Sequence, residues 1–323
     1  MSRGGMLVRG MFAVVFVAGS LAASAAYCKD TVVGFVQVNE RNSWRLADTQ
    51  SVKDSVEKAG YKLLFKEAAD AAANQEDQIR ELVMSGVDVL AFAPSKVEGW
   101  DAILKEVKDA GIPVVVLDRA VNVADQDLFV THIGSDMKAE GVRAGKWLLN
   151  YLKQQGKTGE VKIAVLEGVS GSTPAVYRDK GFRETIAADA NLKIVETAPA
   201  DFNFAKGKEV MADFMKKEAG KIDVVFAHND DMALGAIEAI QEAGKVPGKD
   251  IIIVGVDATK KGFEAIIAGK MNATIECSPL LGPQLVDAVK DILAGKKLEK
   301  NILTNEKDYD VTNAAAEVAN RVY

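Results

Sequence analysis

The stretch Thr31-Val-Val-Gly-Phe-Val-Gln-Val38 decides the fold, because almost every residue in it is apolar or β-branched. Such a short continuous run predicts a strand that is buried on both faces, which is typical of a parallel sheet. Three runs of the same kind follow, at 61–65, 87–92 and 113–117. Between them, apolar residues spaced three and four apart predict helices at 47–59, 75–85 and 100–110, each followed by a glycine. The chain is therefore predicted to have an α/β fold, with helices on both faces of a parallel sheet.

The alternation of strand and helix starts again near residues 131–135, without a linker rich in Pro, Gly or Ser. The predicted elements of this second half are a long helix at 136–155, strands at 161–166, 193–196, 224–227 and 251–256, and helices at 175–188, 206–218 and 232–243. The tail from Ala273 onward predicts a further strand and helices at 285–293 and 313–320. We therefore expect two doubly wound parallel-sheet lobes. A tail that returns to the first lobe would join them by a hinge of several crossings.

The N-terminus has the three-part layout of a secretory signal peptide. Arg3 and Arg9 precede an apolar run at 11–21, and the small residues at 23–25 offer a cleavage site. The run is shorter than the ~20 residues that span a bilayer, so an uncleaved membrane anchor is the weaker alternative. A lipoprotein anchor at Cys28 is not favoured, because the residue before it is a bulky tyrosine. We expect an exported protein.

Size and composition agree with two lobes in one globular protein. The 323 residues are 48% hydrophobic, and a chain of about 300 residues usually divides into two cores. The predicted parts are a signal peptide at 1–26, an N-terminal lobe at 27–133 plus about 278–305, and a C-terminal lobe at 134–277 plus about 306–323. Loss of the signal peptide changes the formal charge from −6 to −8 and no stripe of Lys and Arg is present, so we expect no nucleic-acid partner.

The two cysteines, Cys28 and Cys277, are predicted to be unpaired. Cys28 precedes the first strand, whereas Cys277 follows a strand of the second half at its carboxyl end, near the expected cleft. Eight extended residues span about 25 Å, far more than the ~7 Å limit between the Cα atoms of a disulfide. A bridge between the two thiols is therefore not expected.

Polar side chains gather directly after the predicted strands. They are found at 39–45, 118–119, 167–173, 201–202, 228–231 and 257, with Arg178 one helical turn further on. Ligands of open parallel sheets bind at the carboxyl ends of the strands, and two such lobes that face each other form a cleft. Carboxylates accept hydrogen bonds from sugar hydroxyls, and Arg and Asn donate to them. Trp44 and Phe202 are suited to cover the apolar faces of a sugar ring.

The residues after a strand belong to a loop, and loops are polar in most proteins. At any single position, an ordinary surface loop is therefore a serious alternative to a binding site. We favour a site for Asp118, Arg119, Asn229 and Asp257 when they are taken together with Trp44. For Trp44 alone, packing in the core is an equal alternative.

Signatures of catalysis are missing from the sequence. The chain has two His residues without metal-ligand spacing, no Gly-x-Ser-x-Gly and no Gly-x-x-x-x-Gly-Lys-Ser/Thr. The glycine-rich turn at 168–173 and the Asp230-Asp231 pair are weaker signals, which a tight turn and a helix start explain as well. We therefore expect a protein that is not an enzyme, with no catalytic residue, no bound metal and no cofactor.

Several motifs carry a resemblance to a known family. Phe226-Ala-His-Asn-Asp-Asp-Met-Ala-Leu-Gly-Ala236 resembles the signature of periplasmic sugar-binding proteins of the ribose/galactose type. The segments 117–119, 178–182, 200–202 and 254–259 are similar to that family in the same order and spacing, and the resemblance runs from about Thr31 to the end. It implies the two-lobed fold of type I periplasmic binding proteins and a role as the substrate-binding component of an ABC-type sugar importer.

The first polar loop narrows the resemblance. Asn42-Ser-Trp-Arg45, with Gly99-Trp100 later, is similar to the galactofuranose-binding proteins of bacterial ABC importers. The resemblance implies a monosaccharide ligand bound by Arg41, Asn42, Ser43, Trp44, Arg45, Asp118, Arg119, Arg178, Phe202, Asn229 and Asp257. It also implies a periplasmic monomer whose partners are a membrane permease and an ATPase. Cys277 stands where some relatives have a polar residue that contacts the ligand.

Other functions fit the same lobes. A protein that presents a sugar to a chemoreceptor or a sensor kinase would have the same site and another partner, and a secreted enzyme acting on sugars is a further alternative. Transcription repressors of the lactose-repressor type share the lobes but begin with a DNA-reading helix-turn-helix of about fifty to sixty residues. Here the sugar-binding pattern follows the signal peptide directly, which decides against a repressor.

Overall fold

The structure, a computed structural model, describes residues 1–2 and 30–323. Nearly all of the predicted signal peptide, and Cys28 with it, lies outside the described residues. Residues Thr31–Tyr323 form one compact unit. Within the described part of the chain, no helix has the length and apolar character needed to cross a membrane.

The strands of this unit form two six-stranded sheets, in the orders β11-β5-β4-β3-β1-β2 and β12-β10-β9-β8-β6-β7. The strands of the first sheet are β1 (Val32–Gln37), β2 (Lys62–Glu67), β3 (Val89–Phe92), β4 (Val114–Leu117), β5 (Thr131–Gly134) and β11 (Asn301–Leu303). Those of the second are β6 (Val161–Glu167), β7 (Leu192–Pro199), β8 (Val224–Ala227), β9 (Ile252–Asp257), β10 (Ala273–Glu276) and β12 (Asp308–Asp310). Among these strands, only β10 and β12 pair antiparallel. The predicted fold class, two parallel-sheet α/β lobes, is confirmed.

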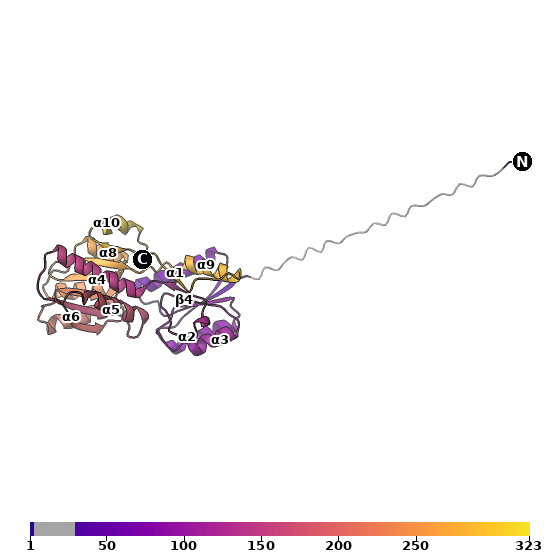
Figure 1. Cartoon of the computed structure of the whole chain (residues 1–323), viewed down its shortest axis with the longest axis horizontal. Helices are drawn as coiled ribbons and strands as arrows, with labels where there is room; N and C mark the ends of the chain where they lie inside the picture. The colour runs from indigo at the N-terminus through magenta and orange to yellow at the C-terminus, as the bar shows by residue number, and fades with distance from the viewer. Residues whose placement is uncertain (3–29) are drawn as a thin grey trace. The chain divides into compact units, whose positions relative to one another are not determined.

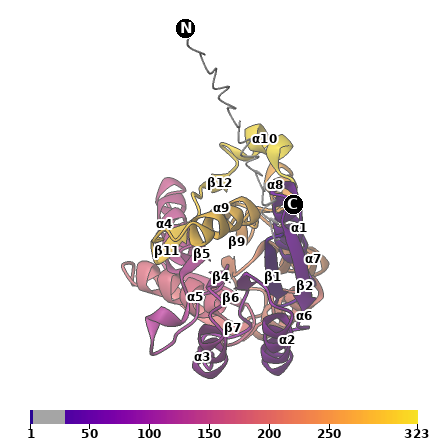
Figure 2. The ribbon, with the colours of Figure 1, turned by 90° about the vertical axis from the view of Figure 1, so that its right-hand side faces the viewer.

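Helices cover both faces of each sheet (Figures 1 and 2). Beside the first sheet lie α1 (Ser43–Lys58) and α9 (Gly282–Leu293) on one face and α2 (Ala72–Met84) and α3 (Asp101–Asp109) on the other. Beside the second lie α4 (Met137–Gln154) and α5 (Thr173–Ile186) on one face, with α6 (Phe204–Lys217), α7 (Asp230–Glu242) and α8 (Lys260–Ile267) on the other. The short helices are η1 (Gln126–Leu128), α10 (Ala314–Glu317) and η2 (Val318–Asn320). We call each sheet with its helices a lobe, first and second in chain order.

Within the described residues the chain passes between the two sheets three times. The connections lie at 135–136, 277–281 and 304–307, and we call them the hinge segments. Hydrogen bonds link them: the Ser135 hydroxyl and the Ser278 N–H both donate to the carboxylate of Glu306. Three linked crossings restrict the lobes to a hinge motion. The residue limits of the lobes given by the sequence stay a prediction.

The first helix begins earlier than predicted, at Ser43 instead of residue 47. Asn42 has an extended backbone and its side-chain oxygen accepts from the N–H of Arg45 at 2.9 Å, so it caps the helix. Trp44 and Arg45 consequently lie in the first helical turn, and not in a loop after β1. This fixes the direction of both side chains.

Three strands and one α-helix were missed in the sequence for simple reasons. In β5 the polar residues Thr131 and His132 interrupt the apolar run, although the strand is buried. The strands β11 and β12 have three residues each, too few for an alternation to be visible. Helix α8 has eight residues, little more than two turns.

Candidate ligand-binding site

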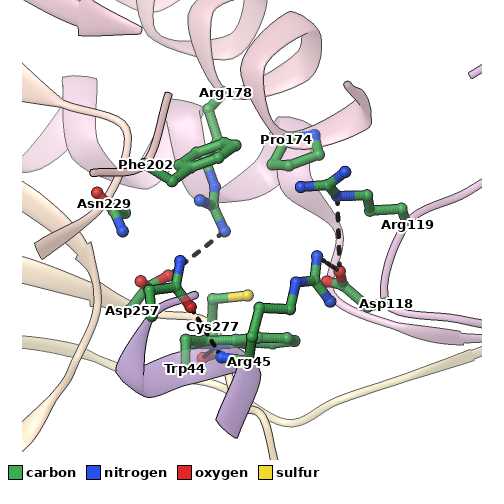
Figure 3. A pocket seen from close by; sticks show the side chains of 11 residues that line it. Trp44, Arg45, Asp118, Arg119, Pro174, Arg178, Phe202, Asn229, Asp257 and Cys277 are labelled. Carbon is green, nitrogen blue, oxygen red and sulfur yellow. Dashed lines mark hydrogen bonds and ion pairs between the residues drawn. The ribbon is translucent and has the colours of Figure 1, made fainter. Parts of the chain in front are cut away.

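A cavity lies between the two lobes, at the carboxyl ends of their strands (Figure 3). Its walls leave about 320 Å³ of empty space. The residues that line it come from both lobes and are Asn42, Trp44, Arg45, Asp118, Arg119, Pro174, Arg178, Phe202, Asn229, Asp257 and Cys277. Direct contacts close the lobes on each other beside the cavity, because the Thr173 hydroxyl donates to the carbonyl of Ala120 at 3.0 Å. The cavity therefore suits a small molecule held by both lobes.

On the side of the first lobe, Asp118 lies between two guanidinium groups. Arg45 donates a hydrogen bond to its carboxylate, and the Nε atom of Arg119 is 3.9 Å from the same oxygen, Oδ2. The contact of Asp118 with Arg119 is thus the longer of the two. Asp118 follows β4 directly and has a φ of +57°, a conformation that is costly for a residue with a side chain.

Behind Arg45, two buried side chains fix its guanidinium from the side away from the cavity. Gln37, in β1, accepts from Arg45 Nη1 at 3.4 Å and donates to Asp48 at 2.9 Å. Asp48 lies 3.8 Å from the same Nη1 atom. Burial raises the pKa of Asp48 to about 7 against the attraction of Arg45. Neither residue was predicted, because the sequence placed Gln37 inside a strand expected to run to Val38 and Asp48 inside a helix.

On the side of the second lobe, Arg178 is held at three points. Its Nε atom donates to Glu140 at 2.6 Å, and Nη1 donates to the carbonyl of His228, also at 2.6 Å. Its Nη2 atom is 3.8 Å from Asp257 Oδ1. Helices α4 and α5 approach closely enough for this because Gly141 faces the Arg178 backbone, where any Cβ would collide with the carbonyl oxygen. Arg178 is therefore rigidly directed at the cavity.

Two polar atoms of the cavity wall have no hydrogen-bond partner in the described part of the chain: Arg119 Nε and Asn229 Nδ2. The other amide atom of Asn229 is engaged, because Oδ1 caps α7 by accepting from Met232 N–H at 3.0 Å. Unpaired buried donors are costly, and a bound ligand with oxygen acceptors would satisfy both. Hydroxyl groups have this capacity.

Burial also shifts the charge balance of the wall. It lowers the pKa of Arg119 to about 9, helped by the nearby charge of Arg45 and opposed by Asp118. It raises the pKa of Asp257 well above its ordinary value, because the attraction of Arg178 does not offset the burial and the neighbouring Asp230. Asp257 is thus driven toward its neutral form, in which it can donate as well as accept a hydrogen bond.

Two aromatic rings lie on opposite sides of the cavity (Figure 3). Trp44 is 5% exposed and its indole N–H donates to the carbonyl of Cys277 at 2.7 Å. Phe202 packs over Gly168, where a Cβ would collide with the ring, and it has a φ of +55°. Trp44 therefore belongs both to the buried core and to the cavity wall. Core packing and a place in the site, which the sequence left as alternatives, are combined in this residue.

The structure brings nine of the eleven predicted binding residues to this cavity and leaves two outside its lining. Arg41 is 64% exposed at the side chain, pairs with Asp70 at 2.7 Å and lines a neighbouring opening between the lobes. Ser43 lies outside the lining of this cavity and of the neighbouring opening. Pro174 was missed as a lining residue, because nothing in its sequence context distinguishes it from an ordinary first-turn proline.

Cys277 lines the cavity and is a free, buried thiol among the described residues. Its carbonyl binds Trp44, and its sulfur lies 3.3 Å from the Ser135 hydroxyl. One group of described residues has atoms of the kind that ligate metals, namely Glu140, Cys277 and Glu306. Arg178 and Arg143 already pair with its two carboxylates, which leaves little negative charge for a cation.

The lobes and the cavity define a two-lobed α/β protein that encloses a small polar ligand. The family model for the periplasmic binding protein domain matches residues 33–297. The galactofuranose-binding protein YtfQ of Escherichia coli K12 is 38% identical over 92% of this chain and 93% of its own. The chain belongs to the periplasmic binding protein family.

Two solved structures are also similar over 90% of this chain. A Mycobacterium smegmatis protein in complex with β-D-fucofuranose has a TM-score of 0.87, 46% identity and 94% of its own chain covered. The periplasmic binding protein of the arabinose ABC transporter from Shewanella sp. ANA-3, bound to α- and β-L-arabinofuranose, has a TM-score of 0.86, 42% identity and 96% coverage. Both are described with a sugar in the furanose form.

Trp44 offers a direct optical test of ligand binding. Of the three tryptophans, only Trp44 lines the cavity, so we expect a bound sugar to change its environment and hence the intrinsic fluorescence. Trp44→Phe keeps a ring but removes the indole, and it should abolish the fluorescence change while weakening binding only moderately. Trp147→Phe, in α4 and outside the cavity lining, is the matched control. A full fluorescence response in Trp44→Phe would contradict this assignment.

Proposed function

We propose that this protein is the substrate-binding component of an ABC-type sugar importer and that it binds a monosaccharide in the furanose form. The observation that carries the proposal is the wall of the cavity. Arginine, aspartate and asparagine side chains from both lobes converge between two aromatic rings, Trp44 and Phe202. Charged groups suit the hydroxyls of a sugar, and the rings suit its C–H faces. The two furanose complexes and the E. coli relative support the ring form.

The binding residues in this proposal are the nine predicted residues that line the cavity, with Pro174 and Cys277 as further wall residues. Arg41 and Ser43 are proposed to act from outside the wall, Arg41 at the neighbouring opening and Ser43 in the first turn of α1. The protein works in the periplasm after cleavage of the signal peptide, as a monomer. It releases the sugar unchanged.

Transport requires that the sugar favours the closed form. Arg45, Asp118 and Arg119 contact it from the first lobe and Arg178, Asn229 and Asp257 from the second. Only a ligand that makes contacts in the closed form that the open form lacks can shift the equilibrium toward closure. The closed protein then docks on the membrane permease, and a separate ATPase supplies the energy. X-ray scattering should show compaction when a binding sugar is added, and an unchanged radius of gyration would contradict this mechanism.

A thermal-shift screen tests the proposed ligand. We expect pentoses and hexoses with accessible furanose forms, such as L-arabinose, D-fucose and D-galactose, to raise the melting temperature. A sugar at a hundred times its dissociation constant adds about 2.7 kcal/mol to the free energy of unfolding. The corresponding alditols are the matched control, because they carry the same hydroxyls but cannot close a ring. No shift with any sugar, or equal shifts with the alditols, would contradict the proposal.

A sugar-presenting role toward a chemoreceptor is the second candidate, since it needs the same cavity. Capture of a permease by the sugar-loaded protein supports import, whereas capture of a receptor ectodomain alone supports signalling. Recovery of the intact sugar after prolonged incubation separates both roles from that of an enzyme.

A further inference from the structure

Glu306 lies behind the floor of the cavity, where the three hinge segments meet. Its carboxylate accepts from the Ser135 hydroxyl, from the Ser278 N–H at 3.1 Å and from the Thr304 hydroxyl at 2.6 Å. Each donor belongs to a different hinge segment, and the Glu306 side chain is 4% exposed. A single carboxylate thus binds all three crossings between the lobes.

Glu140 connects this point to the ligand cavity. One of its oxygens accepts from Arg178 at 2.6 Å, and the other has no hydrogen-bond partner within the described residues, although the side chain is fully buried. Carboxylate oxygens of Glu140 and Glu306 and the sulfur of Cys277 all lie within 4.8 Å of one another. Two buried carboxylates at such a separation cannot both be ionised without a large repulsion.

We propose that Glu306, whose carboxyl lies beside that of Glu140, holds a proton in the closed protein, and that this carboxyl pair couples the ligand-binding Arg178 to the hinge. Glu140 is the positioning residue for Arg178, and Glu306 clamps the hinge segments. The coupling rests on the proposed sugar-binding function. The pair itself is a property of the closed protein with or without a sugar.

The charges that face the pair leave room for one proton. Helix α4 contributes Arg143, whose Nη2 is 3.3 Å from Glu306 and whose Nε is 3.2 Å from Asp308 in β12. Helix α5 contributes Arg178, which pairs with both Glu140 and Asp257, the last residue of β9. The remaining neighbours are the thiol of Cys277 and the carboxylate of Glu276, which Arg321 neutralises at 2.5 Å. Arg143 is therefore shared by the carboxylates of Glu306 and Asp308, and Arg178 by those of Glu140 and Asp257. Two positive charges face four carboxylates.

This balance sets the direction of the pH dependence. Burial, and then the charge of Glu140, raise the pKa of Glu306 to about 7. When the lobes separate and water reaches the hinge, the pKa falls toward the ~4.3 of a free glutamate. Closure therefore takes up a proton between about pH 5 and 7. This proton stabilises the closed form relative to the open form, and the stabilisation is lost as the pH rises through 7. Sugar affinity should fall up to about 30-fold between pH 5.5 and 8, which is the linkage limit for one proton whose pKa moves from ~4.3 to about 7.

The test uses the full-length mature protein and two readouts. The first readout is the affinity for L-arabinose or D-galactose by calorimetry between pH 5.5 and 8. Glu306→Gln mimics the protonated pair and should keep the low-pH affinity at every pH. Glu184→Gln removes an exposed carboxylate of α5 that pairs with Lys138 at 2.7 Å, outside this cluster, and should keep the wild-type profile. A wild-type profile in Glu306→Gln would overturn the proposal.

The second readout is taken on the sugar-saturated, closed protein and does not depend on the affinity. In carbon-13 NMR of the saturated wild-type protein, one glutamate carboxyl should titrate near pH 7, and it should be missing in Glu306→Gln. Thr304→Val, which removes a donor to the carboxylate, should move that midpoint upward and serves if Glu306→Gln does not fold. If a sugar binds but every glutamate of the saturated protein titrates below pH 5, the pair is excluded, whereas a failure of every sugar to bind contradicts the proposed function instead.

Discussion

Arg178→Met is expected to lower the free energy of unfolding by about 3–5 kcal/mol, the cost of leaving one member of a buried ion pair without its partner. Glu140 is fully buried and receives its only hydrogen bond among the described residues from Arg178. The carbonyl of His228 loses its donor as well. Methionine has a similar length, so the space stays filled and the loss is electrostatic. Urea unfolding at pH 7 measures the change.

The double variant Arg178→Met/Glu140→Gln is the control that isolates this cause. It removes the unpaired charge, so we expect it to recover much of the lost stability, because replacing both members of a buried pair is far less costly than replacing one. Sugar binding should stay abolished in both variants, since the cavity has lost its donor in each. Equal stability of the single and double variants would show that the buried charge of Glu140 is not the cause.

The fold and the family were predictable from the sequence because both depend on local pattern. Continuous apolar runs such as 31–38 and 224–227 give the strands, and the glycines after the helices give their ends. The strand-end rule then found Asp118, Asn229 and Asp257, since parallel strands bring their carboxyl ends to one edge. These predictions needed no knowledge of long-range contacts.

The groups that hold the binding residues in place were not predictable in this way. Glu140 and Asp48 stand within helices, where a charged residue in the sequence looks like part of a solvated face. Glu306 lies between two strands of three residues. The partners of Glu140 and Glu306 lie on other elements, 38 residues away for Arg178 and 171 for Ser135. The packing of β1 on α1 brings Gln37 to Asp48.

Backbone strain is a second feature that the sequence did not reveal. Asp118, Phe202 and Asp257 all have a positive φ, of +57°, +55° and +119°. Each such conformation costs about 1–3 kcal/mol in a residue with a side chain. A glycine would avoid that cost but would remove the carboxylate or the ring from the cavity. At these three positions the strain coincides with the cavity wall, whereas Ala69, Asp70, Asp201, Ala219 and Ala258 have a positive φ outside its lining.

Asp118→Ala is expected to weaken sugar binding by at least about 1.5 kcal/mol, the scale of one hydrogen bond to a charged group. The structure gives a second reason for a large effect. Asp118 is the carboxylate between Arg45 and Arg119, and its loss leaves two neighbouring buried guanidinium groups that repel each other. Calorimetry with a sugar that shifts the melting temperature of the wild-type protein measures the change.

The control for Asp118→Ala is Asp125→Ala, which removes an exposed carboxylate of the same lobe that pairs with Lys108 at 3.0 Å. It should leave sugar affinity unchanged, because an exposed pair contributes little and lies outside the cavity. Asp118→Asn divides the effect further, since asparagine keeps an acceptor for the ligand but not the charge between the two arginines. If Asp118→Asn binds like Asp118→Ala, the charge carries the effect; if it binds like the wild type, the acceptor does. Unchanged affinity in Asp118→Ala would remove Asp118 from the binding site.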